Sequence, residues 1–278
     1  MISCTRREPP GANACGIQSK GIAMPTWDSS SSAGKLPVEY QPIVSARSGA
    51  LTGAELITRR SNGQAKQTTP EFASLFDCAC ADLARWQCRA PSRMALSIPI
   101  STDQLLDKRF RPLVAHYVQK HHIRPAGIRF DLREPKERDV TGIVVQRLSD
   151  LRRMGISIVL DDFGVKHSTL SSLITLPVSG LKFGRQFTAS LPDDVTSVGI
   201  LTNVVSLASN LGISVAIAGV ENAGQLAWLG RFADLDVQGN MISRSLSSEA
   251  LLYWLLRRPT GLAPNGGAHE SAGKASVR

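Results

Sequence analysis

Apolar and polar residues recur along this chain in two periods, and their order predicts strands that alternate with helices. Short apolar runs at Val38–Val44 and Gly53–Thr58 flank the turn sequence ARSG, which predicts a hairpin. The stretch Thr69–Glu71 then supplies a helix cap, a first-turn proline and an early acid. Apolar residues follow at helical spacing as far as Trp86, so a long helix is predicted after the hairpin.

Strand–helix units continue to the end of the patterned region. Further strands are expected at Met94–Ile100, Ile128–Leu132, from Ser157 with Asp161 and Asp162 at the C-terminal lip, at Leu181–Phe183, Ser214–Val220 and Leu235–Val237. Further helices are expected from Ser101 or Thr102 through Val118, through Ile143–Leu151, from Ser168, through Val198–Leu211, at Asn222–Leu229 and after Ser247 or Ser248. Such units with short connections predict an α/β protein with a mostly parallel sheet, and their number favours a closed TIM-type barrel.

The two ends of the chain lack this periodicity. Residues 1–35 carry Gly, Pro and the run SSSSAG and are expected to be a disordered leader, and residues 259–278 a flexible tail. A single barrel domain is therefore expected at residues 36–258. No apolar stretch is long enough to span a membrane and no signal peptide is evident, so we expect a cytoplasmic protein.

The composition is basic but gives no nucleic-acid signature. The formal net charge is +9 and the pI is near 9.7, a balance that favours anionic partners. The basic residues are scattered and aromatic residues make up only 5% of the chain, so we expect a solvated basic surface rather than a stacking platform. No DNA-reading motif is present. The five cysteines have no metal-binding spacing and are expected to be free thiols.

Polar residues follow successive strands where each strand is expected to end, and barrel enzymes place their sites at these ends. In chain order these positions hold Glu55, Pro99, Asp131, Asp161 with Asp162, Lys182, Glu221 and Gln238. Several carboxylates with one lysine on a common rim predict a divalent-cation site for phosphate chemistry. The alternative is that individual acids cap the helices that follow.

These positions lie within stretches that resemble a known family. The stretches are VEYQPIVSARSGALTGAELITR, SIPISTDQL, FDLREP, DDFGVKHSTL, LPVSGLKFG, AIAGVENAGQL and DVQGN. In order and spacing they resemble the landmarks of EAL domains, the bacterial cyclic di-GMP phosphodiesterases with a modified (β/α)8 barrel. The resemblance implies that two Mg²⁺ or Mn²⁺ ions activate a water molecule that attacks one phosphodiester.

The resemblance implies roles residue by residue. The implied metal ligands are Glu55, Asp131, Asp161 and Asp162, and the implied catalytic residues are Lys182, which orients water, and Glu55. The implied ligand-binding residues are Gln41, Glu55, Arg59, Asp162, Glu221 and Gln238. Glu134 matches the glutamate that supports the loop after DDFG.

The departures from the family pattern concern the metal site. Pro99 stands where the family has a ligating asparagine, and Ala218 where it has a glutamate. Asp131 is one methylene shorter than the expected glutamate, and Gly184 replaces an acid. The loop after DDFG reads VKHST, with Val165 and Lys166 in place of Thr and Gly. Because Mg²⁺ is demanding about the number and geometry of its ligands, we expect metal binding to be weak or absent.

The sequence is compatible with three functions. The leading hypothesis is a degenerate EAL-like regulatory protein, either a cyclic di-GMP receptor or a module that binds a protein partner such as a transcription regulator. The alternative is an active, Mg²⁺- or Mn²⁺-dependent cyclic di-GMP phosphodiesterase. The resemblance also raises the expectation of a homodimer.

Overall fold

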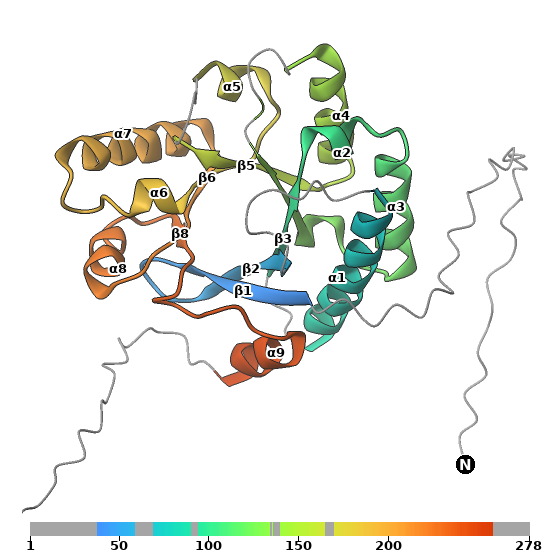
Figure 1. Ribbon diagram of the computed structural model, residues 1–278, viewed down its shortest axis with the longest axis horizontal. Helices are drawn as coiled ribbons and strands as arrows, with labels where there is room; N and C mark the ends of the chain where they lie inside the picture. The colour runs from blue at the N-terminus through green and yellow to red at the C-terminus, as the bar shows by residue number, and fades with distance from the viewer. Residues whose placement is uncertain are drawn as a thin grey trace, which may run out of the picture. The chain divides into compact units, whose positions relative to one another are not determined.

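The computed structural model describes residues 38–58, 69–89, 94–133, 135, 140–164 and 170–257. Within these ranges eight strands pair in chain order and close into a barrel (Figure 1). The strands are β1 (Val38–Ser45), β2 (Leu51–Thr58), β3 (Ala95–Ile100), β4 (Ile128–Arg133), β5 (Ser157–Phe163), β6 (Gly180–Phe183), β7 (Ser214–Ile217) and β8 (Leu235–Val237). β1 runs antiparallel to both β2 and β8, whereas the other neighbouring strands pair in parallel.

Helices surround the barrel on its outside (Figure 1). They are α1 (Thr69–Arg89), α2 (Thr102–Leu106), α3 (Phe110–Lys120), η1 (Pro125–Gly127), α4 (Gly142–Arg153), α5 (Leu170–Thr175), α6 (Arg185–Thr188), α7 (Val195–Leu211), α8 (Ala223–Leu229) and α9 (Ser248–Arg257). The predicted opening hairpin and the predicted α/β barrel of the modified TIM type are therefore confirmed.

The hydrophobic core lies between the barrel wall and this helical layer. On β4, Phe130 is fully buried and its ring lies 6.0 Å from that of Phe76 on α1 and 5.6 Å from that of Phe110 on α3. Successive strand residues point to opposite faces, so Asp131, the next residue, points into the barrel. The inward positions of several strands carry polar residues, and these supply the candidate site.

The single helix predicted from Ser101 or Thr102 through Val118 is wrong. α2 ends at Leu106 and α3 begins at Phe110. Asp107 adopts an extended backbone, with φ −64° and ψ 123°, and its Oδ1 accepts a hydrogen bond from the backbone N–H of Arg109 at 2.9 Å. This local turn competes with the helix, as aspartate side chains commonly do.

One strand end also differs from the prediction. β7 ends at Ile217 rather than Val220, because Gly219 has a φ of +78°, which takes the chain out of the extended region. Asp161 and Asp162 lie near the C-terminal end of β5, as predicted. Asp162 is a non-glycine residue with a positive φ, 58°, so the chain turns at this residue.

Several predictions fall outside the described residues. They are the leader at 1–35, the tail at 259–278, Arg59, Glu134, Val165, Lys166 and the helix start at Ser168. In the described part of the chain, no helix combines the length and the apolar character that a membrane crossing requires.

Candidate functional site

The ammonium group of Lys182 lies where three carboxylates meet inside the barrel. Its Nζ is 2.8 Å from Glu55 Oε2, 3.0 Å from Asp131 Oδ2 and 3.7 Å from Asp161 Oδ1. The Lys182 and Asp131 side chains are only 6% and 1% exposed, respectively. A buried cation with this many anionic neighbours is the main electrostatic feature of the barrel interior.

Strand register accounts for this meeting point. Lys182 lies on β6, Asp161 on β5, Asp131 on β4 and Glu55 on β2. Glu55 pairs with Ser97 on β3, and Asp131 pairs with Pro99 two residues further along the same strand. Because residues at alternate positions share a face, inward side chains from four strands reach one point.

The pKa values of the central pair reflect burial and charge. Burial alone would lower the pKa of Lys182, but the carboxylates of Asp161, Glu55 and Asp131 hold it well above its usual value. Burial also raises the pKa of Asp131 to about 6, even though Lys182 opposes the shift. Lys182 is therefore a permanent cation at neutral pH, whereas Asp131 titrates near that range.

Gln238 connects this cluster to Gln41 on β1. Its Nε2 donates to Glu55 Oε2 at 2.6 Å and to Gln41 Oε1 at 2.8 Å. Gln41 in turn donates through Nε2 to the carbonyl oxygen of Ser243 at 3.1 Å. The two predicted ligand-binding glutamines and Glu55 thus form one hydrogen-bonded chain that fixes the orientation of both amides.

The two remaining predicted acids are paired with arginines at the rim. Asp162 Oδ2 lies 3.7 Å from Nε of Arg133, and burial followed by the charge of Asp161 raises the pKa of Asp162. Glu221 Oε1 lies 2.6 Å from Nη2 of Arg185. Neither acid has an ion pair with Lys182 among the described contacts, so the five predicted acids do not form one cluster.

Pro99 and Ala218, the two expected departures without a side-chain oxygen, lie near the end of β3 and directly after β7. Pro99 is the strand neighbour of Asp131 and offers no side-chain oxygen. Ala218 contributes only backbone groups: its N–H donates to the carbonyl of Phe183 at 2.9 Å, and its carbonyl accepts from the Thr188 hydroxyl at 2.7 Å. Neither side chain therefore offers an oxygen atom to a metal ion.

Some buried polar atoms in the barrel have no hydrogen-bond partner among the described residues: Ser97 Oγ, Asp131 Oδ1 and Gln238 Oε1. Glu55, Asp131 and Asp161 are the described carboxylates from which a metal site at this point would be built. No set of three or more His, Cys, Asp or Glu residues in the described ranges is arranged to hold a metal ion.

Sequence reasoning missed Arg133 and Arg185. Arg133 follows Asp131 by two residues on β4, so strand alternation could have placed it on the same face. Arg185 is the first residue of α6, directly after Gly184. Its proximity to Glu221 depends on how the loop after β7 packs, for which the sequence pattern gives no signal.

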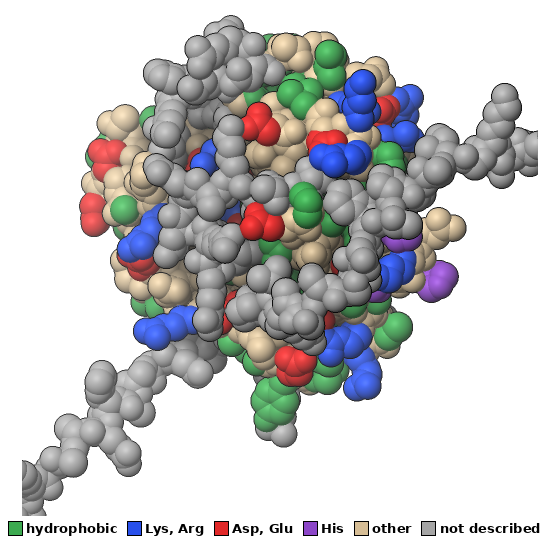
Figure 2. All heavy atoms as spheres, turned by 45° about the vertical axis from the view of Figure 1, so that its right-hand side comes forward, with side chains coloured by type: hydrophobic (Ala, Val, Ile, Leu, Met, Phe, Trp, Pro, Cys, Tyr) green, Lys and Arg blue, Asp and Glu red, His purple; other side chains and the backbone are tan. Residues whose placement is uncertain are grey.

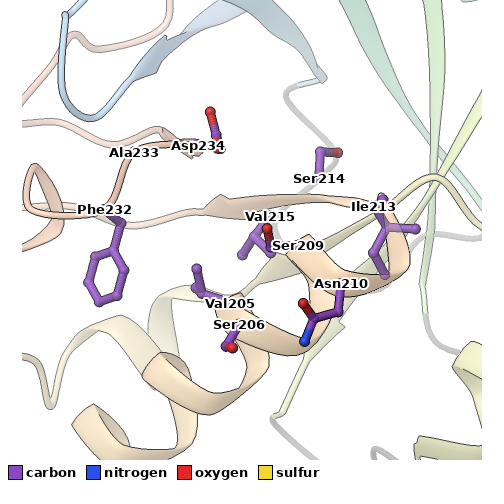
Figure 3. Close-up of a pocket in the computed structure, with 11 residues that line it drawn as sticks. Val205, Ser206, Ser209, Asn210, Ile213, Ser214, Val215, Phe232, Ala233 and Asp234 are labelled. Carbon is purple, nitrogen blue, oxygen red and sulfur yellow. The ribbon is translucent and has the colours of Figure 1, made fainter.

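A hollow lies away from these residues (Figure 3). It has a volume of about 510 Å³ and lies between the end of α7, the start of β7 and the segment before β8, with Val205, Asn210, Val215, Phe232 and Asp234 among its lining residues. It contains none of the predicted site residues. On the face drawn in Figure 2, lysines and arginines are interspersed with acidic and apolar side chains rather than gathered into one patch.

The protein is a closed α/β barrel of the TIM type, and it carries a lysine and several acidic side chains toward the carboxyl ends of its strands. The sequence model described as EAL domain matches residues 26–245, and the chain belongs to this family.

Curated relatives are longer proteins. The chain is 27% identical over 236 residues to the bifunctional diguanylate cyclase/cyclic di-GMP phosphodiesterase MucR of Pseudomonas aeruginosa, covering 78% of this chain and 34% of that protein. It is 26% identical to the cyclic di-GMP phosphodiesterase RocR of the same organism, covering 79% of this chain and 59% of RocR. The chain spans 28% to 34% of the length of the first curated relatives it matches.

Solved structures show the same fold. The phosphodiesterase PaMucR in complex with c-di-GMP superposes with a TM-score of 0.68 at 26% identity, covering 78% of this chain and 94% of that one. The EAL domain of Mycobacterium smegmatis DcpA superposes with a TM-score of 0.71 at 24% identity, covering 83% and 99%.

Proposed function

We propose that this chain is a regulatory protein that binds cyclic di-GMP at the mouth of its barrel and does not hydrolyse it efficiently. The mouth is the end of the barrel at which the parallel strands have their carboxyl ends. The observation that carries the proposal is the position of Lys182, whose ammonium group lies among the carboxylates of Glu55, Asp131 and Asp161. A fixed positive charge there offsets part of the negative charge of these three acids without a metal ion.

Two observations support ligand binding at the mouth. Gln41, Glu55 and Gln238 match ligand-binding positions of the family and are held in one hydrogen-bonded chain. The similar protein PaMucR has been solved as a c-di-GMP complex. A preformed set of polar groups loses little freedom on binding, which favours affinity.

The donor set does not fit a pair of divalent ions, and this supports impaired hydrolysis. Pro99 and Ala218 offer no side-chain oxygen, while Asp162 and Glu221 are directed to Arg133 and Arg185. Mg²⁺ needs nearly ideal octahedral coordination by oxygen. A chemical step that needs two metal ions therefore lacks the ligands to position them.

The deciding experiment measures binding and turnover separately. Purified protein is titrated with cyclic di-GMP by calorimetry, with EDTA and with Mn²⁺, and the linear product is followed by chromatography. We expect binding in both conditions and little product. Gln41→Ala should weaken binding at least tenfold, because Gln41 anchors the amide chain. Gln146→Ala, which alters an exposed glutamine on α4, should leave binding unchanged.

Turnover at the rate of RocR, assayed in parallel, would overturn the proposal in favour of an active phosphodiesterase. If cyclic di-GMP binds neither with nor without Mn²⁺, the remaining hypothesis is a module that binds a protein partner.

Restoring ligands tests the metal argument directly. We expect Pro99→Asn, Asp131→Glu and Ala218→Glu together to raise Mn²⁺ affinity at least tenfold, because two of the changes add side-chain oxygens and Asp131→Glu extends an existing carboxylate by one methylene. Mn²⁺ binding is measured by electron paramagnetic resonance of the free ion. The matched control carries Ala218→Gln in place of Ala218→Glu and should gain less. Equal affinity for the triple variant and the parent protein would mean that the ligand positions are misassigned.

A further inference from the structure

Two arginines stand at the mouth of the barrel outside the expected set of ligand-binding residues. Arg133 lies at the end of β4, and Arg185 lies at the start of α6, separated from β6 by Gly184. β5, which carries Asp161 and Asp162, runs between β4 and β6. With neighbouring strands about 4.8 Å apart, the backbones of the two flanking strands are separated by roughly 10 Å.

Each arginine is anchored on one side and exposed on the other. Arg133 Nε lies 3.7 Å from Asp162 Oδ2, and 68% of the Arg133 side chain is exposed. Arg185 Nη2 lies 2.6 Å from Glu221 Oε1, and 72% of the Arg185 side chain is exposed. A guanidinium group carries five N–H donors, so one such contact leaves donors for an incoming anion.

The position of Arg185 is fixed by a close backbone approach. A Cβ added at Gly219, in the loop after β7, would lie 2.6 Å from Arg185 Cβ and 2.7 Å from Arg185 Cα. The glycine thus allows the first turn of α6 to lie directly against this loop, and Glu221 follows two residues later. This packing fixes the backbone from which the guanidinium group extends.

The ion pairs Arg133–Asp162 and Arg185–Glu221 also change the charge that an anion meets at the mouth. Asp162 and Glu221 would repel a phosphate group if they were uncompensated. With an arginine on each, their charge is offset by a group that binds phosphate oxygens well, often through two parallel hydrogen bonds. The outer part of the mouth can therefore accept an anion without a metal ion to bridge the charges.

We propose that Arg133 and Arg185 bind the phosphodiester groups of a nucleotide ligand directly, in the place that metal ions take in a metal-dependent site. This inference rests on the proposed function, since it assumes that the mouth binds a cyclic dinucleotide. It adds the residues that hold the phosphates and the prediction that binding is independent of metal.

The test is a calorimetric titration of the full chain with cyclic di-GMP in EDTA. We expect Arg133→Gln and Arg185→Gln each to weaken binding at least tenfold and the double variant to weaken it further. Arg133→Lys and Arg185→Lys should recover part of the loss, because lysine keeps the charge but not the planar fork. The matched control is Arg153→Gln: Arg153 is 69% exposed and pairs with Asp150, but lies at the end of α4, just before the start of β5. Its affinity should equal that of the parent protein.

The outcomes separate this inference from the proposed function. If the parent protein binds in EDTA and neither glutamine variant loses affinity, the arginine site is refuted while the receptor function stands. Binding that appears only after Mn²⁺ is added also refutes the arginine site. If cyclic di-GMP binds under no condition, the proposed function fails and the inference fails with it. Thermal melts of each variant identify any that lose affinity by unfolding.

Discussion

Lys182 illustrates how one side chain can decide the chemistry of a barrel interior. A buried lysine without anionic neighbours would lose its proton readily, since burial lowers its pKa. Here the carboxylates of Asp161, Glu55 and Asp131 reverse that effect. The same ion pairs make each acid dependent on the lysine, because a buried carboxylate without a counter-charge is strongly unfavourable.

Removal of the lysine charge should therefore be costly. We expect Lys182→Met to lower the free energy of unfolding by about 3–5 kcal/mol at pH 7, as when one partner of a buried ion pair is deleted. The measurement is urea denaturation followed by circular dichroism. The matched control is Lys120→Met, which breaks the ion pair between Lys120 and Asp77. The Lys120 side chain is 47% exposed, so the loss of stability should be at most about 1 kcal/mol. Equal losses in the two variants would contradict the central role of Lys182.

The raised pKa of Asp131 predicts a pH dependence of stability. A carboxyl whose folded-state pKa lies above its unfolded value contributes stability that is complete below about pH 4 and is lost as pH rises through about 6. Asp131→Asn removes this titration. We expect the stability of the variant relative to the parent protein to increase by roughly 3 kcal/mol between pH 4 and pH 8.

The measurement for Asp131 is a series of urea denaturations across this pH range. Asp150→Asn serves as the control, because Arg153, followed by Gln146, lowers the pKa of Asp150. Its contribution is complete above about pH 4 and is lost only on further acidification, so the stability of that variant relative to the parent should stay nearly constant across this range. A flat difference for Asp131→Asn would show that this carboxyl is not destabilised by burial.

At the scale of elements, the contact between α6 and the loop after β7 depends on Gly219. Gly219 and Gly212 both have a positive φ, +78° and +67°, but only Gly219 has neighbours where a Cβ would be placed. Gly212→Ala should cost about 1 kcal/mol of stability from backbone strain alone. Gly219→Ala should cost at least about 1 kcal/mol more, because it also collides with the backbone of Arg185.

The measurement is urea denaturation of both alanine variants, together with cyclic di-GMP titration. Gly219→Ala should also weaken ligand binding, since it displaces the element that carries Arg185, whereas Gly212→Ala should not. Similar destabilisation by the two substitutions would mean that α6 adjusts freely.

The elements themselves were largely predictable from the sequence, because strand and helix periods differ and each unit repeats the same order. The hairpin at Val38–Thr58 and the barrel emerged from that pattern. The break at Asp107 did not, because the apolar spacing of Leu105, Leu106 and Phe110 continues through it. A side-chain hydrogen bond to the backbone outweighed the periodicity at that point.

The candidate site was predictable where it depended on strands and not where it depended on loops. Glu55, Asp131, Asp161 and Lys182 lie on strands, and the expectation that strand ends meet at one edge brought them together. The pairing of Glu221 with Arg185 depends on the turn at Gly219 and on the start of α6. Such contacts follow from three-dimensional packing that no local pattern encodes.

At the scale of the whole molecule, the barrel places charged groups at more than one level of its interior. Asp236 on β8 accepts a hydrogen bond from the Thr52 hydroxyl at 3.0 Å and lies 3.9 Å from Arg129 on β4. Arg129 precedes Asp131 by two residues, on the side of the strand away from the mouth. The chain as a whole carries a formal net charge of +9. Local acids at the mouth are therefore embedded in a protein whose overall field attracts anions.

This field predicts that capture of an anionic nucleotide depends on salt. The screening length falls from about 10 Å at 0.1 M salt to about 3 Å at 1 M. We expect the association rate constant for cyclic di-GMP, measured by stopped-flow fluorescence, to fall several-fold over this range, with a smaller change in the dissociation rate constant, because steering acts on encounter. The uncharged nucleoside guanosine is the control ligand and should show little salt dependence if it binds. Equal salt dependence for the charged and the uncharged ligand would assign the effect to protein stability or hydration rather than to steering, and the net charge of +9 would then have no part in ligand capture.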